Sequence, residues 1–184
     1  RKTVEETNYY KETVFLNMGG SDPTNRTMYI LKTLVQIVAI HRIIIVVGSA
    51  YRQYNELLAF TRNNQKVELF KDLSVIEIKR LMSQSSLAIV PASTILYELS
   101  SLGVVPITGY FVANQKRVYQ EFINLQLAFD LGDLNDITQK DLKENLNHII
   151  KKRGVRELIL RRQKEYFDGK SINRLREIIK DLIQ

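Results

Sequence analysis

The sequence contains no cysteine among its 184 residues. Disulfides, thiolate metal sites and cysteine nucleophiles are therefore excluded. It also lacks a long apolar run, because the longest strongly apolar stretch, residues 43–47, is far short of the roughly 20 residues that cross a bilayer. The polar N-terminal residues contain no apolar core of the signal-peptide kind. These absences predict a soluble chain without a transmembrane segment, which we expect in the cytoplasm.

No internal repeat and no Pro/Gly/Ser-rich linker divides the chain. With 45% hydrophobic and 26% charged residues, it can bury one substantial core. We therefore predict a single domain over residues 1–184, with a helical tail over residues 137–184 packed on it. The first residue is an arginine, and residues 1–11 form a polar lead-in to the first apolar run. We expect the chain to be a fragment of a longer protein with a second domain before it.

The formal net charge of +7 lies mostly in the tail. Residues 151–184 contain 11 Lys and Arg against 5 Asp and Glu, which is a balance of +6. Apolar residues occur between these charges at three- and four-residue spacing, which is typical of packed helices with a solvated basic face. Nucleic acid is not expected as a partner. Attraction to anionic ligands or to a membrane surface stays open.

Strand-like and helical patterns alternate along most of the chain. Near-continuous Ile and Val runs favour strands that are covered on both faces, and right-handed crossovers between them give a parallel sheet. The sequence therefore predicts an α/β fold, a doubly wound parallel six-stranded sheet of Rossmann-like type with extra C-terminal helices. The expected strands are residues 14–18, 43–47, 67–70, 87–90, 105–108 and 128–131. The expected helices are residues 27–39, 54–61, 74–83, 95–102 and 116–125.

The loop after the first expected strand, residues 19–25, has the composition of an anion site. Gly19 and Gly20 permit a positive φ and let a ligand approach the backbone. The exposed N–H groups of the following helix would attract phosphate. Four residues of the loop can cap that helix, namely Ser21, Asp22, Thr24 and Asn25. An ordinary strand-to-helix turn would need the same residues, so this loop alone favours neither interpretation.

A second polar loop follows the fourth expected strand. Ser93 or Thr94 is the expected helix cap, and Glu98 lies about one turn into the helix. A carboxylate at this position is favoured by the helix dipole and can accept two hydrogen bonds from a vicinal diol. Glu98 could instead serve as a capping-box glutamate, although it follows Thr94 by four residues rather than by the three of the Ser/Thr-x-x-Glu pattern. Because ligands bind at the carboxyl ends of parallel strands, we expect the two loops at one site.

Three segments in order, residues 19–25 (GGSDPTN), 91–107 (PASTILYELSSLGVVPI) and 113–115 (ANQ), carry a family resemblance. They resemble the C-terminal domain of the UDP-sugar hydrolase of pseudaminic acid biosynthesis, which acts on UDP-2,4-diacetamido-2,4,6-trideoxy-β-L-altropyranose. That hydrolase belongs to the GT-B superfamily, alongside the peptidoglycan N-acetylglucosaminyl transferase. The resemblance covers about residues 14–129. It implies a GT-B C-terminal domain that binds a UDP-sugar.

The resemblance also implies roles for single residues. Glu98 matches the glutamate that holds the ribose hydroxyls of UDP. Leu69, Phe70 and Asp72 lie in the loop whose backbone faces the uracil. The diphosphate and sugar would lie beside Gly19, Gly20, Ser21 and Asn25, with Ser93 and Thr94 at the phosphate-facing helix terminus and Asn114 and Gln115 on the sugar side.

These features predict the nucleotide-sugar-binding half of an enzyme, a UDP-sugar hydrolase or a glycosyltransferase of surface polysaccharide or nonulosonic acid biosynthesis. In the hydrolases that this chain resembles, the general base is a histidine of a Gly-x-Gly-His loop in the N-terminal domain, and the present sequence has no such loop. We therefore predict no catalytic residue, no metal and no cofactor here, inactivity of the chain alone, and structural or solvated roles for His41 and His148. The alternative is a non-catalytic module that binds a nucleotide or a polyanion.

Overall fold

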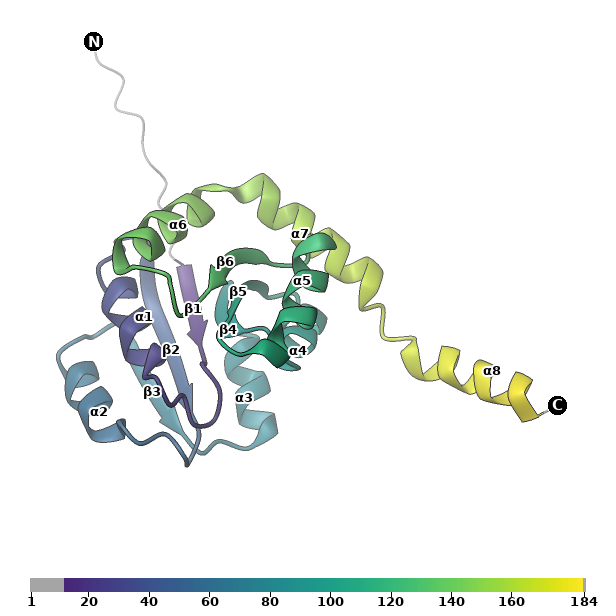
Figure 1. The fold of residues 1–184 in the computed structure, drawn as a ribbon, viewed down its shortest axis with the longest axis horizontal. Helices are drawn as coiled ribbons and strands as arrows, with labels where there is room; N and C mark the ends of the chain where they lie inside the picture. The colour runs from purple at the N-terminus through teal and green to yellow at the C-terminus, as the bar shows by residue number, and fades with distance from the viewer. Residues whose placement is uncertain (1–11, 184) are drawn as a thin grey trace, which may run out of the picture.

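A six-stranded parallel sheet with helices on both faces forms the body of the protein (Figure 1). The computed structural model describes residues 12–183. The strands are β1 (Glu12–Leu16), β2 (Ile40–Val47), β3 (Val67–Lys71), β4 (Leu87–Pro91), β5 (Val105–Tyr110) and β6 (Phe129–Asp133). They are arranged in the order β3-β2-β1-β4-β5-β6. The predicted doubly wound α/β fold is confirmed.

The helices that follow the strands divide into two layers. They are α1 (Arg26–Leu34), α2 (Tyr54–Arg62), α3 (Val75–Met82), α4 (Ile95–Ser101) and α5 (Lys116–Asn124), with a 3-10 turn η1 (Ala113–Gln115) before α5. Apolar residues of α1 and α2 pack in one core cluster with one face of the sheet. Those of α3, α4 and α5 pack in a second cluster on the other face. Alternate residues of β2 enter the two clusters, Ile43 and Ile45 the first and Ile44 and Val46 the second, so the Ile/Val run is buried on both faces.

Element boundaries differ from the predicted ones by a few residues. β1 starts at Glu12 and ends at Leu16, and α1 ends at Leu34 although the apolar pattern continues to residue 39. Short-range turns at Gln36 and Ile37 then lead into β2. The polar lead-in, residues 1–11, lies outside the described residues.

The tail forms three helices, α6 (Gln139–Lys151), α7 (Arg153–Tyr166) and α8 (Ser171–Ile183). α6 packs on the α1 face, through buried residues such as Leu142 and Leu146. α7 crosses the amino ends of the strands, where Arg156 forms two hydrogen bonds of 2.6 and 3.0 Å with the Glu12 carboxylate at the start of β1. On the same helix, the Gln163 amide nitrogen donates to the carbonyls of Val104 and Leu127. The tail up to α7 is therefore part of the packed domain.

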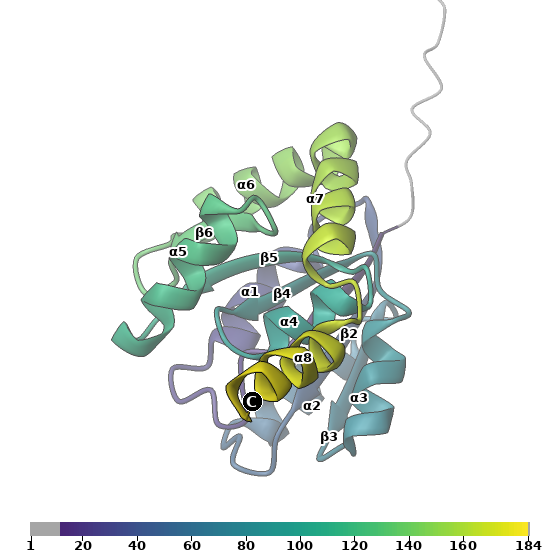
Figure 2. The same cartoon turned by 90° about the vertical axis from the view of Figure 1, so that its right-hand side faces the viewer.

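α8 extends away from the body (Figure 1) and lies in front of it when that side faces the viewer (Figure 2). Its apolar side chains Ile172, Leu175, Ile178, Ile179 and Leu182 are 46–80% exposed. They recur at three- and four-residue spacing and therefore form one apolar stripe. Among residues 12–183, no helix is both long enough and apolar enough to cross a membrane.

Candidate functional site

The strand order changes direction between β1 and β4. These neighbours pair in register at Leu16 and Ile89, and the Asn17 amide donates to the Ile89 carbonyl at 3.2 Å. The chain leaves β1 for α1 on one face of the sheet and leaves β4 for α4 on the other. A crevice opens at the carboxyl ends of two such strands, and it is where ligands bind in doubly wound sheets. The predicted loops 19–25 and 91–94 follow these two strands.

Backbone packing fixes the first loop. Gly19 has a φ of 94°, a conformation that glycine adopts without strain. The Asn17 side chain spans β1 and β2, since its nitrogen donates to the Val46 carbonyl at 2.8 Å and its oxygen accepts from the Gly19 amide at 3.1 Å. A Cβ on Gly48, in the loop after β2, would lie 2.8 Å from the Gly20 carbonyl oxygen. The two loops therefore touch through their backbones.

The first amides of α1 are not available to a ligand phosphate. The buried carboxylate of Asp22, 2% exposed, accepts hydrogen bonds from the backbone amides of Arg26 at 2.8 Å and Thr27 at 2.7 Å. The expectation that these N–H groups are exposed to a ligand is wrong, because the chain supplies its own anion. Asn25 occupies the N-cap position without a capping side-chain bond, and Ser21 is exposed. Of the four candidate caps, Asp22 performs this function.

Asn25 is held by a residue from the second loop. The Tyr51 hydroxyl donates to the Asn25 side-chain oxygen at 2.5 Å. Tyr51 is 2% exposed. Burial raises the pKa of the Tyr51 phenol, and the negative charges of Asp22 and Glu56 raise it further, so the hydroxyl keeps its proton. Sequence reasoning missed Tyr51, because nothing in its local pattern indicates a contact with the first loop.

The fourth loop leaves the Glu98 carboxylate without a protein partner. Thr94 is at the N-cap position but has helical φ and ψ of −55° and −26°, and its side chain caps nothing. Ser93 is half-buried and Glu98 is exposed. Within residues 12–183 the Glu98 carboxylate accepts no hydrogen bond, so no capping box is formed. The carboxylate in the first turn of α4 is thus available to a ligand.

Asn114 and Gln115 lie in η1, at the carboxyl end of β5. The Gln115 side-chain oxygen accepts from the Phe111 amide at 3.0 Å, so this side chain stabilises its own loop. Asn114 is exposed. Within the described chain, no hydrogen bond of its side chain is formed. Of this pair, Asn114 is the one whose side chain is available to a ligand.

The third loop lies at the edge of the sheet. Leu69 and Phe70 belong to β3 and are half-buried, and Asp72 has a φ of 53° and donates its amide to the Val47 carbonyl at 3.1 Å. Three inter-strand spacings, about 14 Å, separate the end of β3 from that of β4. The structure therefore does not bring Leu69, Phe70 and Asp72 into contact with Glu98. One extended ligand would have to span the distance between them.

Three cations near this edge rest on aromatic rings. Arg26 lies 5.3 Å from the Tyr29 ring centre, Lys71 lies 4.7 Å from that of Tyr54, and Lys116 lies 5.1 Å from that of Tyr110. Contact with a ring face restricts each long side chain. The positive charges at the carboxyl edge are thereby held close to the protein surface.

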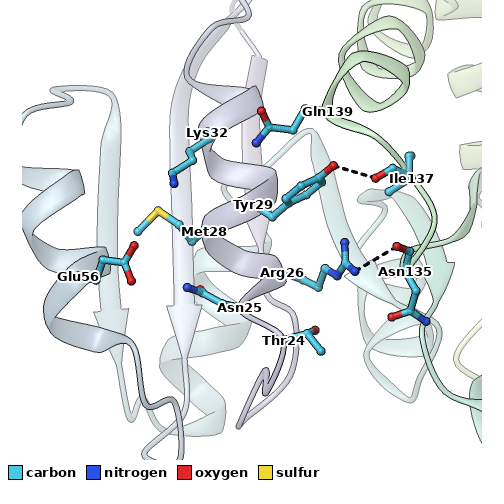
Figure 3. Close-up of a pocket in the computed structure, with 10 residues that line it drawn as sticks. All are labelled: Thr24, Asn25, Arg26, Met28, Tyr29, Lys32, Glu56, Asn135, Ile137 and Gln139. Atoms are coloured by element: carbon cyan, nitrogen blue, oxygen red, sulfur yellow. Dashed lines mark hydrogen bonds between the residues drawn. The ribbon is translucent and has the colours of Figure 1, made fainter.

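A polar groove of about 450 Å³ lies over the N-terminal half of α1 (Figure 3). On one side Arg26 donates to the Asn135 carbonyl at 3.3 Å, and Tyr29 donates to the Ile137 carbonyl at 2.9 Å. These bonds join α1 to the loop after β6. The groove is lined by Thr24, Asn25, Arg26, Met28, Tyr29, Lys32, Glu56, Asn135, Ile137 and Gln139.

Neither histidine lies at the carboxyl edge. His41 is exposed on the second residue of β2, at the amino end of the strand. His148 is exposed on α6 and lines a small cavity with Phe129 and Asp130. Residues 12–183 contain no group of three His, Asp or Glu residues that could hold a metal ion.

The sequence matches no protein-family model and no curated protein. Solved structures are similar to it in fold at low sequence identity. MurG from Acinetobacter baumannii has a TM-score of 0.67 and 12% identity, over 86% of this chain and 46% of that one. The glycotransferase of kitacinnamycin has a TM-score of 0.69 and 13% identity, over 98% of this chain and 46% of that one. Spinosyn rhamnosyltransferase SpnG complexed with thymidine diphosphate has a TM-score of 0.65 and 11% identity, over 86% of this chain and 42% of that one. The chain has the Rossmann-like fold of GT-B C-terminal domains and spans less than half the length of these three proteins.

Proposed function

We propose that the chain is the nucleotide-sugar-binding half of a two-domain GT-B enzyme and that its ligand is a UDP-sugar. The observation that carries this proposal is the unpartnered Glu98 carboxylate in the first turn of α4, the helix that follows β4 at the point where the strand order reverses. A carboxylate there can accept both hydrogen bonds of a ribose diol. The spinosyn rhamnosyltransferase, which shares the fold, is complexed with a nucleoside diphosphate.

The remaining loops would hold the other parts of the ligand. The backbone of residues 69–72 would read the uracil edge, for which no particular side chain is needed. The backbone at Gly19 and Gly20 and the fourth loop would face the diphosphate, and Asn114 would face the sugar. Since Asp22 already occupies the α1 amides, the phosphates would contact other donors of these loops.

The order and spacing of the three motifs favour a UDP-sugar hydrolase of nonulosonic acid synthesis, with a glycosyltransferase of surface polysaccharide synthesis as the second candidate. Both would need a partner domain that supplies the general base. A hydrolase of this kind would activate water against the sugar–diphosphate linkage. The two reactions are distinguished by giving the full-length protein a UDP-sugar and following release of free sugar with and without an acceptor.

Calorimetric titration with UDP tests the binding proposal. Hydrogen bonds to a charged group contribute about 1.5–3 kcal/mol each, so Glu98→Ala should weaken UDP binding about 12- to 150-fold for one net bond lost. Glu144→Ala is the matched control, because Glu144 is an exposed glutamate on α6 outside the candidate site. Equal UDP affinities of wild type and Glu98→Ala would refute the role of Glu98.

A further inference from the structure

The hydrogen bond between Tyr51 and Asn25 determines what Asn25 can offer a ligand. Asn25 has a left-handed backbone, with φ and ψ of 53° and 40°, and its side chain does not cap α1. Its side-chain oxygen accepts the Tyr51 hydroxyl at 2.5 Å. An asparagine amide has one oxygen acceptor and two N–H donors. With the oxygen bonded to a fixed phenol, the side chain presents its two N–H donors.

These donors are directed into the groove, on the side of α1 that faces Glu56. Throughout the described part of the chain, the Asn25 amide nitrogen has no hydrogen-bond partner, and Asn25 is only half-buried. It lines the groove at the mouth of the first loop, where Figure 3 shows its nitrogen directed away from the Asn135 side of α1. Tyr51, in contrast, is buried, and its backbone amide donates to the Gly48 carbonyl at 3.1 Å. A rigid, buried donor thus holds a half-exposed amide.

We propose that Tyr51 is a positioning residue, which orients Asn25 so that the Asn25 amide nitrogen donates a hydrogen bond to an oxygen of the bound ligand. The inference rests on the proposed function, because it places this donor beside the diphosphate and sugar of a nucleotide-sugar. The acceptor is a phosphate oxygen or a sugar oxygen. Both lie at the end of the ligand away from the base.

Tyr51→Phe separates this role from packing. Phenylalanine keeps the buried ring and removes only the hydroxyl. The freed Asn25 amide can then rotate about its side-chain torsions. A neutral hydrogen bond of this kind corresponds to about a 2- to 12-fold change in affinity.

The experiment is a calorimetric titration of wild type, Tyr51→Phe, Asn25→Ala and the double variant with UDP and with UDP-N-acetylglucosamine. We expect each single variant to bind about 2- to 12-fold more weakly, and the double variant to match Asn25→Ala, because both changes remove one interaction. Equal losses for the two ligands place the acceptor on a phosphate, and a loss confined to the UDP-sugar places it on the sugar. Tyr119→Phe is the matched control, since the Tyr119 hydroxyl also donates at 2.5 Å to a side-chain oxygen, that of Asp130 on β6.

A spectroscopic measurement distinguishes positioning from a structural role. The Asn25 side-chain amide resonances, assigned by their absence in Asn25→Ala, should shift on ligand addition in wild type and shift less in Tyr51→Phe. Wild-type affinity in Tyr51→Phe, or losses that add in the double variant, would overturn the inference while leaving the proposed function intact. If wild type itself binds neither ligand, the proposed function fails, and the inference fails with it.

Discussion

Replacing Asp22 by alanine should destabilise the fold, because Asp22 is a buried carboxylate that caps α1. Its two oxygens accept the Arg26 and Thr27 amides at 2.8 and 2.7 Å. Each hydrogen bond to a charged group contributes about 1.5–3 kcal/mol, and loss of an N-cap typically costs about 0.5–2 kcal/mol. Water reaching the opened helix end offsets part of this loss. We therefore expect Asp22→Ala to lower the free energy of unfolding by about 2–4 kcal/mol. The stability of Asp22→Asn should lie between those of wild type and Asp22→Ala.

Thermal unfolding measures this effect directly. For chains of this length, 1 kcal/mol corresponds to a Tm change of about 2–4 °C, so the expected decrease is about 4–16 °C. Asp181→Ala, an exposed aspartate on α8, is the control and should change stability by less than about 0.5 kcal/mol. Inorganic phosphate should raise the Tm of Asp22→Ala more than that of wild type, because an anion can then bind the vacated amides. If Asp22→Ala unfolds with the same Tm as wild type, the capping role is refuted.

Three further results follow from the geometry. Burial raises the pKa of the Glu12 carboxyl, but hydrogen bonds such as those from Arg156 lower it by more, so the pKa in the folded protein is below its ordinary value. The ionised Glu12 therefore stabilises the fold at pH values above the unfolded pKa near 4.3, and this contribution to the free energy of unfolding is lost as pH falls through the folded pKa. Chemical denaturation should therefore find Glu12→Gln less stable than wild type at pH 7, with a smaller difference below about pH 4; a difference independent of pH would contradict this. Removing residues 168–184 should leave the Tm within about 2 °C, since α8 buries none of its described side chains, and a large decrease would mean that α8 packs on the domain. The chain alone should cleave no UDP-sugar in a chromatographic assay. Cleavage by the chain that is abolished when His41 or His148 is replaced would contradict this and place a catalytic centre in this domain.

The sheet was predictable because its signal is local and repeated. The apolar runs of β2 and β4 are long enough to indicate burial on both faces, and the alternation with helical patterns leaves a parallel sheet as the natural arrangement. The end of α1 was not predictable in the same way. The apolar pattern continues beyond Leu34, and no glycine or proline marks the end of the helix there.

The site residues were predictable as loops but not as contacts. Asp22 and Asn25 have the same capping chemistry, and only the backbone conformation decides that Asp22 reaches the helix amides. A capping box was the alternative role for Glu98, but Glu98 lies four residues after Thr94 rather than three, and the helical backbone of Thr94 lies outside the extended region that a capping side chain needs. Tyr51 reaches the first loop from another strand end, so no local pattern could reveal it.

Location of the bound nucleotide tests the central claim most directly. The measurement is the change in backbone amide chemical shifts of the isotope-labelled chain on addition of UDP. We predict that the shifts change in the loops at the carboxyl ends of β1, β3, β4 and β5, including Glu98, and stay constant at the amino ends of the strands where α7 crosses. Changes confined to the basic helices of the tail, or no change at saturating UDP, would contradict the claim that this edge of the sheet binds a nucleotide-sugar.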